Sequence, residues 1–202
     1  MPASYAESTR TGHKQDRLSV RLNRAVFGCE RGRRRREKGG DMPLLSCSLM
    51  YDEWMAAALE EAVRARDAGE VPIGAVVVID GVVVGRGSNQ PISSGDPTAH
   101  AEIVAIRDAA RHVGNYRLTG AVLCVTIEPC LMCIGALVHA RIATVVYGAA
   151  EPRTGAATST VRGAELPGLN HRVQVIGGVR EAACRELMQT FFRERRSPAQ
   201  PA

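Results

Sequence analysis

The sequence has no apolar run of about eighteen residues, the length that a membrane-spanning helix requires, and its N-terminus lacks the short apolar core of a secretion signal. Both absences argue against a protein that spans or crosses a membrane, and they predict a cytoplasmic location. Cysteine is scarce as well, and six irregularly spaced residues in a 202-residue chain do not form a disulfide framework. We interpret them as reduced thiols and metal ligands: Cys29, Cys47, Cys124, Cys130, Cys133 and Cys184.

The hydrophobic content of 45% over 202 residues is enough for one well-buried core. We therefore expect a single folded domain over residues 49–196. A basic and disordered extension over 1–48 would precede it, and a disordered tail over 197–202 would follow.

The basic residues are concentrated at the N-terminus. Residues 1–48 hold eleven Lys and Arg and five Asp and Glu, so the remainder has fifteen basic and sixteen acidic residues and is close to neutral. The run RGRRRREK (31–38) has three interpretations: an arm that neutralises phosphates, a solvated disordered leader, or translated sequence upstream of the true start. A transit peptide fits less well, because such segments are poor in acidic residues.

From residue 51 onward, the sequence alternates between strand and helix patterns. Residues 51–69 have helical spacing, and two β-branched runs joined by Asp80-Gly81 predict a hairpin. A helix is expected over 98–112, with Asp96 as its cap and Pro97 in its first turn. Further strands are expected at 121–127, in IATVVYGA and in RVQVI, with helices over CLMCIGALVHA and toward RERRS. Strands covered by helices on both faces predict a three-layer α/β/α sandwich.

Two short polar stretches in this pattern, TAHAEI (98–103) and EPCLMC (128–133), suggest a metal site. Each lies at the expected start of a helix, where the helix dipole favours thiolates, and Cys130 and Cys133 are spaced to face one side. His100 adds a nitrogen ligand. Zinc with three protein ligands keeps a position for water, which is typical of a catalytic site. Glu102 would lie close to that water and transfer protons.

Each element also has a simpler explanation. A C-x-x-C pair alone is as typical of a redox pair or of half a structural zinc site, and a lone histidine at a helix start is often a partly buried residue with no metal. Glu102 in a first turn complements the helix dipole. The combination at this spacing favours the catalytic site. Cys124 and Cys184 lie in apolar patterns and are expected to be buried thiols.

The pattern His100-x-Glu102 with Pro129-Cys130-x-x-Cys133 resembles that of zinc-dependent nucleobase deaminases. Over nearly all of residues 51–196 the sequence is similar to the bacterial tRNA-specific adenosine deaminases. The matching stretches are VPIGAVVV, DPTAHAEI, NYRL, VTIEPCLMCIGALVHARI, RTGAATS, LNHRV and FFRERR.

This resemblance implies a cytidine deaminase-like fold with a mixed five-stranded sheet, a homodimer with one Zn²⁺ per subunit, and no organic cofactor. It implies hydrolytic conversion of the wobble adenosine of tRNA(Arg), with an ACG anticodon, to inosine. Zinc-bound hydroxide would attack C6 while Glu102 protonates N1 and the departing ammonia. Asn89 would hydrogen-bond the base, and Ile73 and Ala101 would line its pocket; Asn89 alone would also suit a turn beside Pro91.

The anticodon loop would have to open for the base to enter, and phosphate contacts would hold it. The candidates are the 151–155 loop and the end of the last helix, although a basic helix end also compensates the helix dipole. These candidates are Glu151, Arg153, Arg193, Arg195 and Arg196. Three positions depart from the family pattern: Gln90 replaces a usual Arg, Glu151 a common Asp and Thr158 a usual Gly. They bear on RNA contact and leave the chemistry unchanged.

Three other functions compete with tRNA editing. A deaminase of a free base or nucleotide, such as guanine or cytosine, would share the zinc motif; the FFRERR helix and the RTGAA loop favour tRNA. A binding protein that has lost catalysis would lack the glutamate, yet Glu102 is present. A structural zinc module would need a fourth protein ligand at recognisable spacing, and the sequence offers none.

Overall fold

A computed structural model of the chain describes residues 44–196, with side chains from residue 49 onward. The interpretations of the basic run and of the C-terminal tail concern residues outside this range. Within it, no helix is both long and apolar enough to cross a bilayer. The elements, in chain order, are α2 (Leu44–Asp67), β1 (Gly74–Ile79), β2 (Val82–Ser88), α3 (Pro91–Ser94), α4 (Ala101–Val113), β3 (Val122–Ile127), α5 (Leu131–Ala140), β4 (Thr144–Ala149), the 3₁₀ turn η1 (Gly163–Glu165), β5 (Gln174–Gly177) and α6 (Glu181–Arg196).

The five strands form one mixed sheet in the order β2-β1-β3-β4-β5. β1 runs antiparallel to both β2 and β3, whereas β3, β4 and β5 run parallel to one another. The hairpin predicted at Asp80-Gly81 is confirmed, because both residues have the positive φ values that a tight two-residue turn needs. β3 is the central strand of the sheet, and its carboxyl end lies immediately before the segment that contains Cys130 and Cys133.

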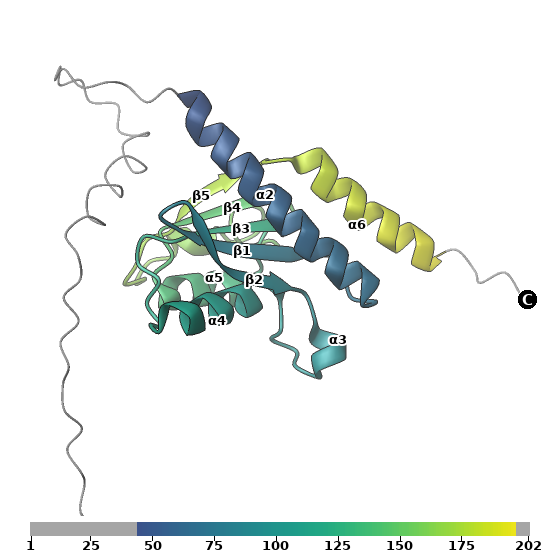
Figure 1. Cartoon of the computed structure of the whole chain (residues 1–202), viewed down its shortest axis with the longest axis horizontal. Coiled ribbons are helices and arrows are strands. Elements are labelled where there is room, and N and C mark those ends of the chain that lie inside the picture. Colours follow the sequence, from purple (N-terminus) through teal and green to yellow (C-terminus); the bar gives the residue numbers. More distant parts are fainter. Residues whose placement is uncertain (1–43, 197–202) are drawn as a thin grey trace, which may run out of the picture. The chain divides into compact units, whose positions relative to one another are not determined.

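Helices cover both faces of the sheet, as Figure 1 shows. α2 and α6 pack with one set of strand side chains, including Val76, Cys124 and Val146. α4 and α5 pack with the opposite set, including Val77, Leu123 and Val145. Successive side chains of each strand thus pack on opposite faces of the sheet, as the two-residue period of a strand requires. The structure therefore confirms the three-layer α/β/α sandwich with a mixed five-stranded sheet.

Two helix starts differ from the sequence-based expectation. α2 begins at Leu44, ahead of the predicted stretch, so the domain boundary expected at residue 49 falls inside this helix. Met50 packs against the core under α2, which extends the apolar stripe upstream. α4 begins at Ala101 rather than at Thr98, and its N-cap position is occupied by His100. The prediction of Asp96 as the cap is wrong, because Asp96 Oδ1 instead accepts hydrogen bonds from the Thr98 amide and hydroxyl in the preceding turn.

Candidate metal centre and active site

The metal ligands are held by the first residues of two helices on the same face of the sheet. His100 and Cys130 occupy the N-cap positions of α4 and α5, both with extended backbone. Cys133 follows in the first turn of α5 and is fully buried. An N-cap residue has left the helical conformation, so its side chain can turn back across the helix end. The two helix ends thereby bring ligands thirty residues apart in sequence to one point.

The three ligand atoms form a triangle whose sides are equal. Cys130 Sγ lies 3.6 Å from Cys133 Sγ, and His100 Nδ1 lies 3.6 Å from each sulfur. Tetrahedral zinc, with bonds of about 2.3 Å to sulfur and about 2.0 Å to nitrogen, places two sulfurs about 3.8 Å apart and sulfur and nitrogen about 3.5 Å apart. The observed triangle fits a zinc ion with Nδ1 as the histidine ligand.

Among the residues that the structure describes, these three form the group whose ligand atoms lie close enough together to hold one metal ion. Three protein ligands leave one tetrahedral position for water or substrate. That is the coordination of a catalytic zinc site, and it disfavours the structural zinc module considered from the sequence.

The ligands are also prepared electrostatically for a cation. The hydrogen bond between the Cys130 and Cys133 thiols lowers the pKa of the Cys130 thiol to about 4 and raises the pKa of Cys133. The pKa of His100 is raised, chiefly by its hydrogen bond with Cys130. The group therefore shares protons around a thiolate. A metal ion can replace those protons, because thiolate and neutral imidazole are the forms that bind zinc.

Glu102 lies in the first turn of α4, two residues after His100, and only 4% of its surface is exposed. Burial raises the pKa of its carboxyl group, and the nearby Cys130 acts in the same direction. A buried carboxyl group beside the metal ligands is suited to accept and return protons.

The predicted base-binding residues surround the entry to α4. Asn89 follows β2, is buried, and donates its backbone N–H to the Ile73 carbonyl over 2.9 Å. The next residue, Gln90, donates its backbone N–H to the Ala99 carbonyl over 3.0 Å, one residue before His100. Ala101, the first residue of α4, is fully buried. The structure therefore brings Asn89 and Ile73 together and joins their segment to the metal ligands.

The predicted RNA contacts fall into two groups on different parts of the domain. Glu151 and Arg153 lie in the loop after β4, where Glu151 Oε1 accepts a hydrogen bond of 3.0 Å from the Arg153 backbone N–H. The remaining candidates are Arg193, Arg195 and Arg196 at the end of α6, a helix on the opposite sheet face from α4 and α5. The structure does not bring these two groups together at the metal ligands.

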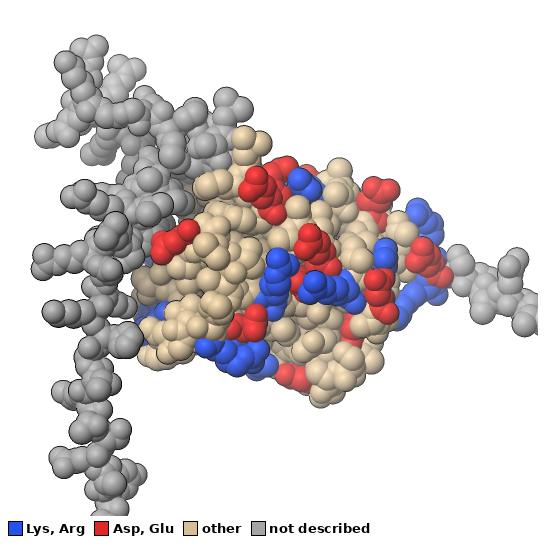
Figure 2. All heavy atoms as spheres, in the orientation of Figure 1, with Lys and Arg blue, Asp and Glu red and all other residues tan. Residues whose placement is uncertain are grey.

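The α6 arginines already have contacts within the protein. Arg195 donates to the carbonyl of Gly69, just after α2, and its guanidinium lies 4.6 Å from the centroid of the Phe191 ring. Arg196 Nε donates to the Phe192 carbonyl, and Arg193 to the Thr190 hydroxyl. On the face drawn in Figure 2, basic and acidic side chains are interspersed, in line with the near-neutral charge of this part of the chain.

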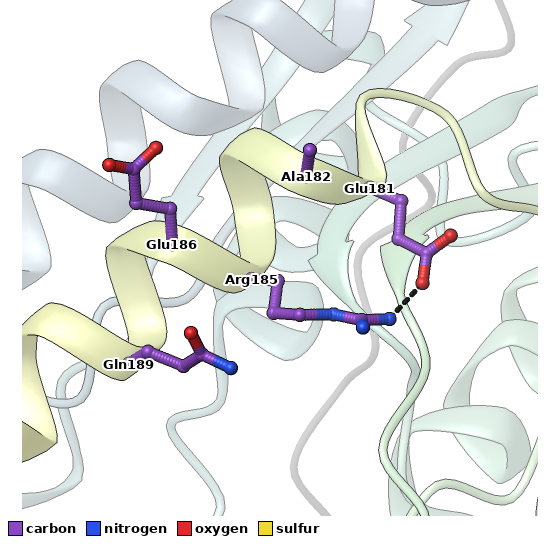
Figure 3. A pocket seen from close by; sticks show the side chains of 5 residues that line it. All are labelled: Glu181, Ala182, Arg185, Glu186 and Gln189. Carbon is purple, nitrogen blue, oxygen red and sulfur yellow. Dashed lines mark hydrogen bonds and ion pairs between the residues drawn. The ribbon is translucent and has the colours of Figure 1, made fainter.

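A shallow hollow on α6 is separate from the metal ligands. It is lined by Glu181, Ala182, Arg185, Glu186 and Gln189. Figure 3 shows these side chains along one side of the helix, with Arg185 donating to Glu181. Because its charges are of both signs and partly paired with each other, the hollow offers no clear preference for a ligand.

Two buried carboxylates that join separate segments of the chain, Glu70 and Glu128, were not identified from the sequence. Glu70, after α2, accepts a hydrogen bond of 2.7 Å from the Ser93 amide in α3. Glu128, between β3 and Cys130, accepts several hydrogen bonds from the loop after β4, and although burial opposes its charge these bonds keep the pKa of its carboxyl lowered. An acidic residue at the end of an apolar strand and two residues before a ligand was the available signal for Glu128.

The fold and the metal centre define a zinc-binding deaminase domain. Residues 50–149, which contain all three ligands and Glu102, match the family described as the cytidine and deoxycytidylate deaminase zinc-binding region. The chain is 45% identical over 148 residues to a tRNA-specific adenosine deaminase of Haemophilus influenzae, covering 72% of this chain and 86% of the relative. The chain therefore belongs to the tRNA-specific adenosine deaminase family.

Solved structures agree with this family. A structure from a study of A-to-I editing by tRNA:A34 deaminases at the wobble position shares 45% identity and a TM-score of 0.65, over 67% of this chain and 98% of that chain. A guanine deaminase from Nitrosomonas europaea has a TM-score of 0.61 at 18% identity, over 92% of this chain and 98% of that chain. At that identity the second likeness concerns the fold alone.

Proposed function

We propose that the protein hydrolyses adenosine to inosine in tRNA, at the wobble position of tRNA(Arg) with an ACG anticodon. The observation that carries the hydrolytic chemistry of this proposal is the triangle of His100 Nδ1 and two cysteine sulfurs with 3.6 Å sides, next to the buried Glu102. The names of the 45% identical relatives support tRNA as the substrate class.

The chemistry divides between the metal and the chain. Zinc, when bound, lowers the pKa of a coordinated water and so supplies a nucleophile at neutral pH. His100, Cys130 and Cys133 hold the ion. Glu102 would accept one proton from the attacking water and deliver it to N1 of the adenine. It would then take the second proton from the hydroxyl group now on C6, which becomes the carbonyl of inosine, and pass it to the amino group, which leaves C6 as ammonia. The products are inosine and ammonia, and the glutamate returns to its starting state.

The base must leave the anticodon stack before it reaches Glu102. We place Asn89 as the residue that hydrogen-bonds the inserted base, with Ile73 and Ala101 as its apolar surroundings. Arg153 and the backbone around Glu151 would contact the RNA backbone beside the site. The α6 arginines would contact a more distant part of the tRNA, because they lie on the opposite face of the sheet.

A deaminase of a free base is the alternative, because the zinc ligands and Glu102 serve either substrate. Incubating the zinc-loaded protein with a tRNA(Arg) transcript and reading A-to-G changes on sequencing separates the two. We expect conversion at the wobble adenosine alone. Free adenosine, cytidine and guanine, followed by ammonia release, are the parallel substrates. Turnover of a free base without tRNA conversion would show that the protein is a small-molecule deaminase.

We further propose that the protein works as a homodimer in the cytoplasm, and that α5 and the segment around η1 form the contact between subunits. Four large apolar side chains are exposed there: Leu131 at 53%, Met132 at 37%, Val161 at 48% and Leu166 at 39%. Leu131 also approaches Gly163 of η1, so the two segments adjoin. Apolar side chains gathered in this way are typical of an interface.

Leu131→Glu is expected to shift the protein from dimer to monomer in sedimentation velocity, because a charge would be buried at the contact. Val113→Glu is the matched control, since Val113 is 44% exposed at the far end of α4; it should stay dimeric. A wild-type protein that sediments as a monomer at micromolar concentration would contradict the dimer.

A further inference from the structure

Glu128 connects the metal-ligand segment to the loop that follows β4. Its side chain is buried, with 3% exposure. One carboxylate oxygen, Oε2, accepts hydrogen bonds from the Glu151 amide and the Ser159 hydroxyl. The other, Oε1, accepts the amides of Thr158 at 2.7 Å and Ser159 at 2.9 Å. One side chain thus holds both the beginning and the end of the 151–159 loop.

The loop also contacts the ligand segment through its backbone. The Ala156 amide donates to the Pro129 carbonyl over 2.8 Å, and Cys130 forms an isolated β-bridge with Gly155. A Cβ on Gly155 would lie 2.5 Å from the Glu128 carboxylate, so the loop backbone rests directly on that group. The 151–159 loop is therefore attached directly to the segment that carries the ligand Cys130.

The Thr158 side chain strengthens this attachment. Its hydroxyl lies 2.7 Å from the Tyr147 hydroxyl and 3.3 Å from Glu128 Oε1. Tyr147 belongs to β4, which pairs with β3 directly ahead of Glu128. The loop is thereby fixed to the sheet as well as to the ligand segment.

If Glu128 only accepted hydrogen bonds from buried amides, its loss would change the stability of the fold and nothing else. The loop that Glu128 holds carries Arg153, whose side chain is exposed, while Glu128 itself stands two residues before Cys130. The distance between an RNA-contacting guanidinium and the metal therefore depends on this tether. A base must arrive within a few tenths of an ångström of its reactive position, so such a distance affects substrate capture.

We propose that Glu128 is a positioning residue for the RNA substrate: it fixes the 151–159 loop against the Cys130 segment so that Arg153 meets a backbone phosphate at a set distance from the zinc ligands. The proposal rests on the proposed function. It predicts that losing the tether weakens the use of tRNA while the metal centre stays loaded.

The test compares Glu128→Gln with Glu61→Gln in the full-length zinc protein. The glutamine keeps the size of Glu128 but turns one acceptor into a donor, which faces other donors. Glu61 is an equally buried carboxylate, on α2, paired with Arg64 and Arg86 and away from the loop. It controls for the loss of a buried charge. Zinc content, melting temperature, amide hydrogen exchange, and kcat and KM for the tRNA are measured for both variants.

For Glu128→Gln we expect one zinc per chain, faster exchange of the 151 and 158–159 amides, and a KM for tRNA raised about tenfold with kcat within about threefold of wild type. Glu61→Gln should lower the melting temperature without changing exchange in this loop or KM. Ser159→Ala removes one donor instead of the buried acceptor, so it should change exchange and KM in the same direction by less, even if Glu128→Gln folds poorly.

Unchanged loop exchange in Glu128→Gln would overturn the tether. Faster exchange with an unchanged KM, or a KM change matched by Glu61→Gln, would overturn the positioning role and leave Glu128 a stabilising residue. A wild-type protein that binds zinc but converts no tRNA would instead reject the proposed function, and the exchange data would still decide whether Glu128 holds the loop.

Discussion

Glu102→Gln is expected to lower the rate of adenosine conversion by about a hundredfold to ten-thousandfold, the usual contribution of a positioned acid–base group. The amide has nearly the shape of the carboxylate, so it fits the buried position at the start of α4. It cannot accept the proton from water or pass one to N1. Because Glu102 is not one of the three grouped ligands, zinc content should stay at one per chain.

Single-turnover conversion of the tRNA and zinc measured by atomic spectroscopy test both parts of this expectation. Glu60→Gln serves as the control, since Glu60 is an exposed carboxylate on α2, and it should keep wild-type rates and zinc. Conversion by Glu102→Gln at a rate near that of wild type would show that another group transfers the proton. Loss of zinc from this variant would make Glu102 part of the ligand set.

Cys133→Ala is expected to remove bound zinc and abolish conversion. The ion would keep only His100 and Cys130, and two protein ligands do not complete either type of zinc site. The matched control is Cys124→Ala, because Cys124 is also a fully buried thiol on the same domain. Burial raises the pKa of Cys124, which keeps it a neutral thiol in β3 and away from metal chemistry.

Zinc content after dialysis, circular dichroism and tRNA conversion distinguish the two cysteine variants. Cys124→Ala should retain zinc and activity with a modest loss of stability, since only a small cavity is created. Equal zinc loss from both variants would indicate that unfolding removes the metal. Full zinc retention by Cys133→Ala would contradict the assignment of this residue as a ligand.

Much of the fold follows from local patterns. The β-branched runs, the Asp80-Gly81 turn and the helical spacing after residue 51 indicate elements that the structure contains, because backbone propensity and side-chain period act within a few residues. The start of α4 was predicted wrongly for a related reason. Asp96 and Pro97 suit a helix start locally, but His100 has extended backbone at the helix end and directs its ring toward the cysteines.

The ligand set could also be found from the sequence, since zinc chemistry restricts the residue types and the spacing within each helix start. The sequence by itself thus determined the order of the strands and main helices and the residues that the structure brings together as metal ligands, and it led to the prediction of Glu102 as the acid–base residue. Only the tertiary structure decided which distant groups support them. Glu128 accepts hydrogen bonds from amides 23 to 31 residues away in the sequence, and Arg195 donates to a carbonyl 126 residues away. Such contacts depend on how the sheet and helices pack, and no local pattern encodes that packing.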